Sequence, residues 1–277
     1  MPECILSSFS DNGKLKPVDS FPEINKSDYL YLYEVIRVID GKLLFLEDHI
    51  ERLKQSISLA EKELGLPEQI VAERMKQVIT TNSLHEGNLK LVLLFKKNKN
   101  TKKGRMLSCI TPHYYPPKAL YQTGIQTVTL EAERMNPNVK MLHEELKTRI
   151  EEKTGSTDYF EVLLVNRSGN ITEGSKSNVF FVKENTVITP PAADILEGIT
   201  RKKVIEICRN NHIDFREETI PLQEIPKMRA AFITGTSPKV LPVKKINELA
   251  FQVPDVLVDK IMHAYDEEIN RYLKSCK

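Results

Sequence analysis

Residues 171–182 read ITEGSKSNVFFV, and this stretch decides how the second half of the chain is interpreted. The end of this stretch, from Asn178 on, belongs to the segment 178–183, whose β-branched and aromatic side chains predict a strand. The pair Glu173-Gly174 predicts a turn ahead of that strand, because glycine adopts turn conformations at little cost. The stretch therefore predicts a glycine-containing turn that leads into a strand.

A second glycine turn lies at Gly198, in the sequence ILEGITRKKVI of residues 195–205. The spacing of apolar residues predicts a helix over 200–210, so Gly198 stands at the beginning of that helix. A helix N-terminus presents N–H groups and the positive end of the helix dipole, which suits a phosphate. The hydroxyl of Thr200 could add another donor there.

A third glycine turn lies at Gly235, in the sequence ITGTSPKVLPV of residues 233–243. It follows a strand predicted over 229–234. Thr236 could supply a further hydroxyl to a phosphate site. Gly-Thr turns usually serve only as turns, so the spacing alone leaves both interpretations open.

The first half of the chain predicts strands followed by helices. Residues 31–40, YLYEVIRVID, favour a strand, and Asp40-Gly41 predicts a hairpin whose return strand covers 42–46. Asp48 is the expected N-cap of a helix, and Pro67 opens a second helix. The other strands predicted in this half are 89–95 and 106–110.

The second half alternates strands and helices more regularly. The predicted strands are 125–130, 161–165, 178–183, 187–188 and 229–234, and the predicted helices are 140–153, 200–210 and 256–273. Residues 111–124, TPHYYPPKALYQTG, contain three prolines and are the best candidate for a linker. We therefore expect a small N-terminal domain over 1–115, a linker over 116–124 and a large domain over 125–277.

Composition and charge argue against several classes of protein. The 277 residues include 40 Lys and Arg and 38 Asp and Glu, and the net charge of +2 does not favour nucleic acid as a partner. The basic run 96–105 has no interleaved aromatic residues and is interpreted as a solvated hairpin loop. None of the six histidines has a metal-ligand spacing and no CxxC pair occurs, so no metal site is expected. Without a signal segment or a long apolar run, we expect a cytoplasmic protein that does not enter membranes.

The order of the motifs resembles that of a known family. Residues 33–38, YEVIRV, with Gly41 and the sequence FLEDHIERL at 45–53, resemble its N-terminal signature. ITEGSKSNVFFV, the TPP of residues 189–191, ILEGITRKKVI and ITGTSPKVLPV match its second half in order. From about Glu34 to Val243 the chain resembles the class IV pyridoxal-phosphate aminotransferases. This family includes branched-chain aminotransferases, D-amino acid aminotransferases and aminodeoxychorismate lyases.

The resemblance implies an α+β fold of type IV, with a smaller N-terminal α/β domain, a larger C-terminal α/β domain and pyridoxal 5'-phosphate in the cleft. It implies an aminotransferase that moves an amino group between an amino acid and a 2-oxo acid, and a homodimer. One alternative is a 4-amino-4-deoxychorismate lyase of the same fold. Another is a relative that binds the cofactor but has altered or lost its turnover.

The family uses a lysine that forms a Schiff base with the cofactor, some 30-odd residues before the glutamate that matches Glu173. Lys140, in the sequence RMNPNVK, has this separation from Glu173, whereas Lys147 stands too close to it. Lys140 therefore fits, and Lys147 is interpreted as a solvated helical lysine. As a free amine Lys140 would move a proton between the substrate α-carbon and the cofactor.

The resemblance also implies roles for other residues. Glu173 would lie against the pyridine nitrogen, and Arg52 would bind the cofactor phosphate. Outside this family, Arg52 would be interpreted as a partner of Asp48 on a helix surface. The remaining cofactor residues implied are Ile199, Thr200 and Thr236, and the implied substrate residues are Tyr33 and Ser237.

Three positions depart from the family pattern. Tyr29-Leu30-Tyr31 stands where many members have Gly-Asp-Gly, which implies a differently shaped substrate pocket. Glu145 stands where branched-chain enzymes place a tyrosine against the cofactor. Arg105 and His113 are the only candidates for the carboxylate trap of D-amino acid aminotransferases. The substrate therefore stays open.

Overall fold

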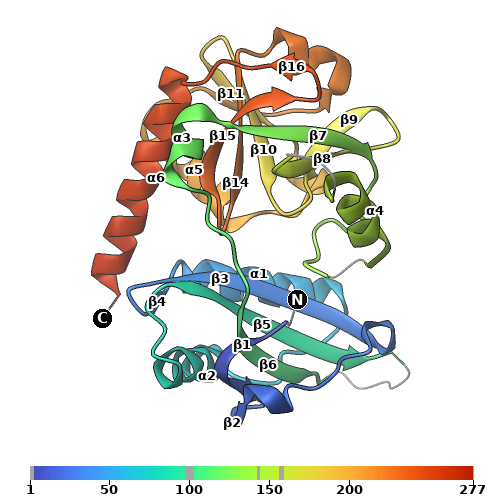
Figure 1. The fold of residues 1–277 in the computed structure, drawn as a ribbon, viewed down its shortest axis with the longest axis vertical. Coiled ribbons are helices and arrows are strands. Elements are labelled where there is room, and N and C mark those ends of the chain that lie inside the picture. Colours follow the sequence, from blue (N-terminus) through green and yellow to red (C-terminus); the bar gives the residue numbers. More distant parts are fainter. Residues whose placement is uncertain (1–2, 98–102, 142–143, 156–158, 277) are drawn as a thin grey trace. The chain divides into compact units, whose positions relative to one another are not determined.

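The computed structural model describes residues 3–97, 103–141, 144–155 and 159–276. Contacts between residues divide the chain into two compact units. Unit 1 contains the described residues of Met1–Tyr114, Val139–Leu142 and Asn270–Lys277. Unit 2 contains those of Tyr115–Asn138 and His143–Ile269. Figure 1 follows the chain through both units, and each is described by itself.

The strands and helices occupy the following ranges. In the first half they are β1 (Ile5–Asp11), β2 (Lys14–Pro17), β3 (Tyr29–Ile39), β4 (Lys42–Leu43), α1 (Leu46–Leu59), α2 (Glu68–Thr81), β5 (Gly87–Lys96), β6 (Arg105–Thr111) and α3 (Lys118–Thr123). In the second half they are β7 (Ile125–Glu131), α4 (Glu144–Thr154), β8 (Glu161–Val165), β9 (Asn170–Gly174), β10 (Asn178–Lys183), β11 (Thr186–Thr189), α5 (Ile199–Asn210), β12 (Phe215–Glu217), β13 (Ile220–Pro221), β14 (Ala230–Gly235), β15 (Lys239–Ile246), β16 (Leu249–Ala250) and α6 (Val256–Ser275).

The described strands of unit 1 form a sheet in the order β2-β1-β6-β5-β3-β4. β3 is its longest strand, and it pairs with β5 from Tyr29 opposite Lys96 to Val38 opposite Gly87. Side chains alternate along β3, so that every second residue from Leu32 to Val38 is buried. The hairpin predicted at Asp40-Gly41 is confirmed, although its return strand is only Lys42–Leu43.

Helices α1 and α2 cover one face of this sheet (Figure 1). Apolar residues of α1 recur at helical spacing and pack on Leu32 and Ile36 of β3. The predicted N-cap Asp48 is wrong, because α1 begins at Leu46 after Phe45, whose φ of 52° turns the chain into the helix. Pro67 occupies the N-cap position of α2 rather than its first helical residue.

The described strands of unit 2 form a mixed sheet in the order β12-β11-β10-β14-β15-β7-β8-β9-β13, with β16 beside β15. β7 lies parallel to both β15 and β8, while β10 and β14 are antiparallel. Its core contains the buried aliphatic and aromatic residues of these strands, among them Val179, Phe181 and Ile233. The strands predicted over 125–130, 161–165 and 178–183 are confirmed as β7, β8 and β10.

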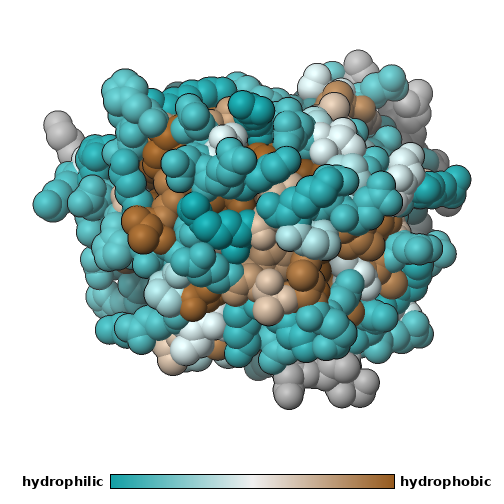
Figure 2. Space-filling model, turned by 90° about the horizontal axis from the view of Figure 1, so that it is seen from above, coloured by the Kyte–Doolittle hydropathy of each residue, from teal (hydrophilic) through white to brown (hydrophobic). Residues whose placement is uncertain are grey.

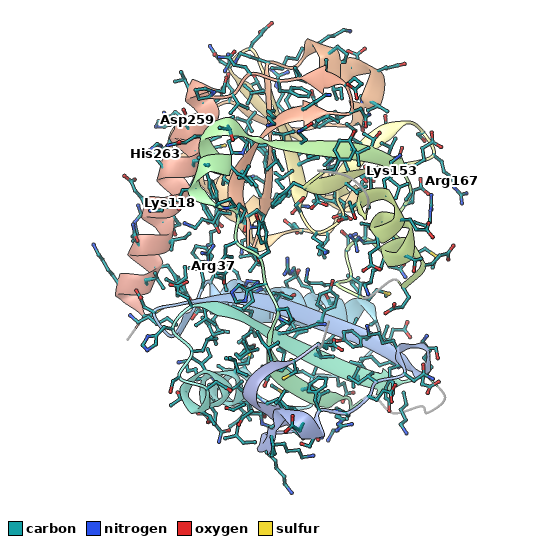
Figure 3. All side chains as sticks on the ribbon, viewed as in Figure 1. Arg37, Lys118, Lys153, Arg167, Asp259 and His263 are labelled. Carbon is teal, nitrogen blue, oxygen red and sulfur yellow. The ribbon has the colours of Figure 1, made fainter. Side chains whose placement is uncertain are left out.

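The helices of the second half of the chain differ from prediction mainly at their ends. The helix expected over 140–153 begins at Glu144 as α4, and Lys140 lies before it, next to Met141, which forms an isolated bridge with Leu32. Helix α6 continues to Ser275. Figure 3 shows Asp259 and His263 on α6, one turn apart, and the His263 ring lies 2.7 Å from the Asp259 carbonyl.

The expected domain boundaries stay a prediction. The stretch 116–124 contains the short helix α3, and Lys140, which those boundaries assign to the large domain, is grouped with unit 1. The loop expected at 96–105 falls partly outside the described residues, although β5 and β6 on either side of it pair as predicted.

The side of the molecule in Figure 2 carries mainly hydrophilic residues, with apolar residues in separate patches. Among the described helices, none has the length and apolar character needed to cross a membrane.

Candidate functional site

The segment of Lys140 lies along strand β3 in unit 1. Met141 bridges Leu32, and the Tyr33 amide donates to the Lys140 carbonyl at 3.1 Å. The Lys140 amide in turn donates to the Ser56 hydroxyl of α1 at 3.3 Å. These contacts fix the backbone, and Lys140 Nζ lies 5.0 Å from the centre of the Tyr33 ring. The structure therefore brings together two of the residues predicted for the site, Lys140 and Tyr33.

The Arg52 guanidinium is paired with the buried carboxylate of Glu34. Its Nε lies 2.9 Å from Glu34 Oε1, and its Nη2 lies 2.5 Å from Glu34 Oε2. His49 Nδ1 is 2.8 Å from the same Oε2, and all three residues are buried. Because Glu34 accepts from two nitrogens of the planar guanidinium, it fixes the orientation of that group.

Burial and the neighbouring side chains determine which groups of this cluster are charged. Burial would raise the pKa of Glu34, but the positive charge of Arg52 and the hydrogen bonds from His49 and Arg52 outweigh it and hold the pKa at about 2. Burial lowers the pKa of His49 more than Glu34 raises it. His49 is thus a neutral imidazole that orients the carboxylate, and Glu34 carries the charge that Arg52 neutralises.

Glu173 lies in strand β9 of unit 2 and is held from two directions. Arg134 Nε donates to its Oε1 at 2.8 Å, and Arg134 Nη2 donates to the Ser175 carbonyl at 3.2 Å. The Leu196 amide donates to Oε2 at 3.2 Å. The carboxylate is almost fully buried, so these donors fix its direction and compensate its charge.

Asn178 joins the three glycine motifs in unit 2. Its side-chain amide donates to the Leu196 carbonyl at 2.8 Å, close to where Leu196 binds Glu173. Its backbone pairs with Thr234 at the end of β14, next to Gly235. A Cβ on Gly198 would overlap the Asn178 side-chain oxygen, which explains why that position is glycine. Motifs that stand far apart in the sequence thus meet at one place.

The N-terminus of α5 matches the donor set of a phosphate site. Its N-cap is Gly198, which has no side chain to cap the helix. Ile199 and Thr200 follow it and are buried, and the Thr200 hydroxyl lies 3.3 Å from the Tyr265 hydroxyl. The N–H groups of the first turn and the Thr200 hydroxyl are suitable donors for a phosphate group, and Gly198 has no side chain that would block its approach.

Thr236 and Ser237 lie in the turn between β14 and β15. Gly235 begins this turn, and a Cβ there would press on the ring of Pro238 at 3.2 Å. Asn178, the first residue of β10, pairs with Thr234 of β14, so this turn begins beside the start of β10.

A family model described as Amino-transferase class IV matches residues 31–246. The chain belongs to the class IV aminotransferases. The resemblance predicted from the motifs is therefore confirmed. Pyridoxal 5'-phosphate, the cofactor that the resemblance implies, is the cofactor of this family, and a branched-chain amino acid aminotransferase of the same fold is solved with pyridoxamine 5'-phosphate.

Several known proteins are similar to the chain over most of its length. The D-alanine aminotransferase of Bacillus licheniformis is 31% identical over 225 residues, which cover 78% of each chain. That of Staphylococcus aureus is 26% identical over 277 residues, covering 95% of this chain and 97% of the relative. The solved branched-chain amino acid aminotransferase of Escherichia coli has a TM-score of 0.83 at 20% identity and covers 95% of this chain and 94% of its own. The likeness to that structure confirms the predicted fold.

The departures from the family pattern lie in regular structure. Tyr29-Leu30-Tyr31 continues strand β3 without interruption, and Glu145 lies in α4. Arg105 makes two hydrogen bonds to Asp11, at 2.9 and 2.7 Å, and His113 is exposed. Arg105 thus has a carboxylate of the chain itself as its partner.

Lys147 has the surroundings of a surface residue. Its side chain is 49% exposed and pairs with Glu151 one turn along α4, at 3.5 Å. This is consistent with its interpretation as a solvated helical lysine.

Sequence reasoning missed Glu161, which holds the loop after Glu173. This carboxylate is buried at the start of β8 and accepts hydrogen bonds from Ser175, Lys176 and Ser177 at 2.6 to 3.3 Å. The available signal was the glutamate at the start of the apolar run EVLLV. An acidic residue in a buried strand needs several hydrogen-bond donors, so this position indicates a carboxylate that holds nearby donor groups.

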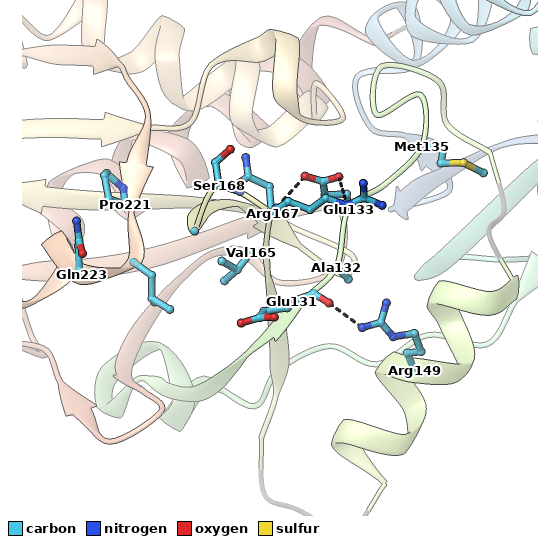
Figure 4. Close-up of a pocket in the computed structure, with 13 residues that line it drawn as sticks. Glu131, Ala132, Glu133, Met135, Arg149, Val165, Arg167, Ser168, Pro221 and Gln223 are labelled. Carbon is cyan, nitrogen blue, oxygen red and sulfur yellow. Dashed lines mark hydrogen bonds and ion pairs between the residues drawn. The ribbon is translucent and has the colours of Figure 1, made fainter.

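A cavity of about 800 Å³ opens on unit 2, and none of the residues that line it is a predicted site residue (Figure 4). Its rim includes Arg149, which donates to the Glu131 carbonyl at 2.7 Å, and Arg167, which pairs with Glu133 at 3.7 Å. Both arginines are thus bound to the wall of the cavity. Among the described residues, no group of three or more His, Cys, Asp or Glu could hold a metal ion.

Proposed function

We propose that the chain is an aminotransferase that moves an amino group between an amino acid and a 2-oxo acid, with pyridoxal 5'-phosphate bound covalently to Lys140. The observation that carries the proposal is the setting of Lys140. Two backbone hydrogen bonds hold its segment, and its Nζ lies over the Tyr33 ring, on the strand that also carries the buried Glu34. A fixed backbone with a flexible amine is the arrangement that a lysine needs to bind and release a cofactor.

When bound, pyridoxal phosphate supplies a ring that accepts electrons from the substrate α-carbon. Lys140 Nζ holds the proton that leaves that carbon and returns it during transfer of the amino group. The electron-rich face of Tyr33 stabilises the cationic form of Nζ, so that the protonated amine stays in position between the two transfers.

Glu173 would bind the ring nitrogen of the cofactor. Its carboxylate is fixed by Arg134 and by the Leu196 amide, so that it can accept a hydrogen bond without reorganising. Arg134 also keeps a positive charge beside the carboxylate, which limits how strongly Glu173 attracts the proton of the ring nitrogen.

The phosphate would bind the amides of Ile199 and Thr200 with the hydroxyls of Thr200 and Thr236. The glycine N-cap of α5 supports this assignment. Arg52 would add a guanidinium to the same phosphate, with Glu34 setting the orientation of that guanidinium. Ser237 and Tyr33 would contact the substrate.

The test is amino-group transfer by the purified holoenzyme from a panel of L- and D-amino acids to 2-oxoglutarate and pyruvate. We expect transfer from at least one donor, loss of transfer in Lys140→Ala, and activity within about twofold of the native value in the control Lys147→Ala. Release of pyruvate from aminodeoxychorismate without an amino acceptor would contradict the proposal and identify a lyase instead.

The resemblance also supports a homodimer, and the four free cysteines support a location in the reducing cytoplasm. Light scattering after gel filtration should give twice the chain mass of 31.8 kDa. A mass of one chain would contradict the homodimer.

A further inference from the structure

A tyrosine of the C-terminal helix contacts the predicted phosphate site of unit 2. Helix α6 buries one face at helical spacing, made of Val258, Ile261, Tyr265 and Ile269. Of these four residues, only Tyr265 carries a polar group. Its hydroxyl lies 3.3 Å from the Thr200 hydroxyl, in the first turn of α5, and both residues are buried. A buried tyrosine hydroxyl needs a hydrogen-bond partner, and Thr200 is such a partner.

The residue after Tyr265 contacts the other element that is predicted to supply a hydroxyl. Asp266 Oδ1 accepts a hydrogen bond from Lys239 Nζ at 2.7 Å. Lys239 begins β15, directly after the turn that carries Thr236. One turn of α6 therefore lies beside both the N-terminus of α5 and the turn between β14 and β15.

A phosphate bound at this site would fix the direction of the hydrogen bond between the two hydroxyls. Each hydroxyl has one hydrogen to donate and an oxygen that can accept. If Thr200 donates its hydrogen to a phosphate oxygen, the Thr200 oxygen accepts the hydrogen of Tyr265. The two bonds then form a chain that ends on the phosphate, and bonds in such a chain polarise and strengthen one another.

We propose that Tyr265 is a positioning residue of the phosphate site, which donates to Thr200 and thereby directs the Thr200 hydroxyl toward the cofactor phosphate. This inference rests on the proposed function, in which Thr200 binds that phosphate. Tyr265 lies beyond the last motif used to recognise the chain. Because Tyr265 acts through Thr200, its effect requires both the Thr200 hydroxyl and the phosphate.

The experiment compares two forms of the cofactor that differ only in the phosphate. The full-length protein, freed of cofactor, is titrated with pyridoxal 5'-phosphate and separately with pyridoxal, and the absorbance of the Schiff base gives a Kd for each. The quantity compared is the ratio of the Kd for pyridoxal to the Kd for pyridoxal 5'-phosphate. The variants are Tyr265→Phe, Thr200→Val, their double variant and Thr200→Ser. The control is Tyr272→Phe, which removes a hydroxyl of the same helix that donates to Glu47 at 2.7 Å.

We expect Tyr265→Phe to lower this ratio by about fivefold, which corresponds to about 1 kcal/mol, while the Kd for pyridoxal stays within about twofold of native. Thr200→Val should lower the ratio by about tenfold or more. The double variant should lower it no further than Thr200→Val, because Tyr265 then has no hydroxyl through which to act. Thr200→Ser and the control should stay within about twofold of native.

Circular dichroism of each variant checks that the fold is retained. The double variant replaces both partners by apolar groups and leaves no buried hydroxyl of this pair without its partner. Its comparison with Thr200→Val therefore tests the inference even if Tyr265→Phe is unstable.

An unchanged ratio in Tyr265→Phe, or equal losses of affinity for the two forms of the cofactor, would overturn the inference and leave the proposed function standing. A double variant with a clearly lower ratio than Thr200→Val would overturn it in the same way. If the native protein forms no Schiff base with pyridoxal 5'-phosphate, the proposed function fails, and this inference fails with it.

Discussion

Replacing Glu34 by Gln should lower the free energy of unfolding, because the substitution leaves the Arg52 guanidinium buried without a compensating charge. Glu34 is 1% exposed and accepts two hydrogen bonds from Arg52, at 2.9 and 2.5 Å. Glutamine keeps the size of the side chain, removes its charge and replaces one of its two accepting oxygens by a donating NH2 group. The substitution therefore removes the ion pair and at least one accepted hydrogen bond without changing the volume of the side chain.

The expected magnitude follows from the pKa of Glu34. A fall from the ordinary value of 4.5 to about 2 corresponds to roughly 3 kcal/mol of stabilisation, at about 1.36 kcal/mol for each pH unit. Removing one partner of a buried ion pair typically costs about 3–5 kcal/mol, which agrees with this value. We expect Glu34→Gln to lower the free energy of unfolding by about 3 kcal/mol.

Urea unfolding followed by circular dichroism measures this change. With a dependence of about 1–3 kcal/mol per molar urea, the midpoint should fall by roughly 1 M or more. The control Glu68→Gln removes an exposed partner of Lys54 at 2.8 Å and should change stability by less than about 1 kcal/mol. If Glu34→Gln lowered the free energy of unfolding by no more than this control, the argument that Glu34 compensates the buried charge of Arg52 would be refuted.

Three further predictions concern acid stability and the site of unit 2. Because the pKa of His49 is lowered in the fold from 6.5 and that of Glu34 from 4.5 to about 2, unfolding free energy measured against pH should begin to fall below about 6.5 and fall more steeply below about 4.5; a flat profile between about pH 7 and pH 3 would contradict this. Gly198→Ala should weaken pyridoxal phosphate binding by about tenfold or more in an equilibrium titration, because the new Cβ displaces the Asn178 side chain; affinity within twofold of native would contradict it. Arg134→Gln should lower kcat by about 10- to 100-fold, the value of a charged hydrogen bond, while the control Arg149→Gln stays within twofold, and equal effects of the two would count against the role of Arg134.

The sequence is sufficient to predict the strands with strong side-chain patterns. β3 and β5 are dominated by β-branched, aromatic and other apolar residues, and that composition predicts their existence. β1 escapes prediction because Ile5–Asp11, ILSSFSD, mixes polar and apolar residues and is stabilised by pairing with β6, which lies far along the chain. Long-range pairing of this kind leaves no local signal.

Residue identity at the site is easier to predict than the contacts of each residue. The separation from Glu173 selects Lys140, but the sequence predicts a helix there, whereas in the structure Met141 forms an isolated bridge with Leu32 of β3. Arg52 is selected by motif, whereas its partner Glu34 can be identified only once β3 and α1 are packed together. Glu34 alternates with Leu32 and Ile36 on the buried face, and this alternation is the signal that it needs a cation.

The most direct test of the central claim is the identity of the lysine that binds the cofactor. Reduction of the yellow holoenzyme with borohydride fixes the cofactor to the chain, and mass spectrometry of the digested protein locates the modified residue. We predict a single modified lysine at Lys140, with no modification in Lys140→Ala. Modification of Lys147 or of another lysine in the native protein would contradict the account.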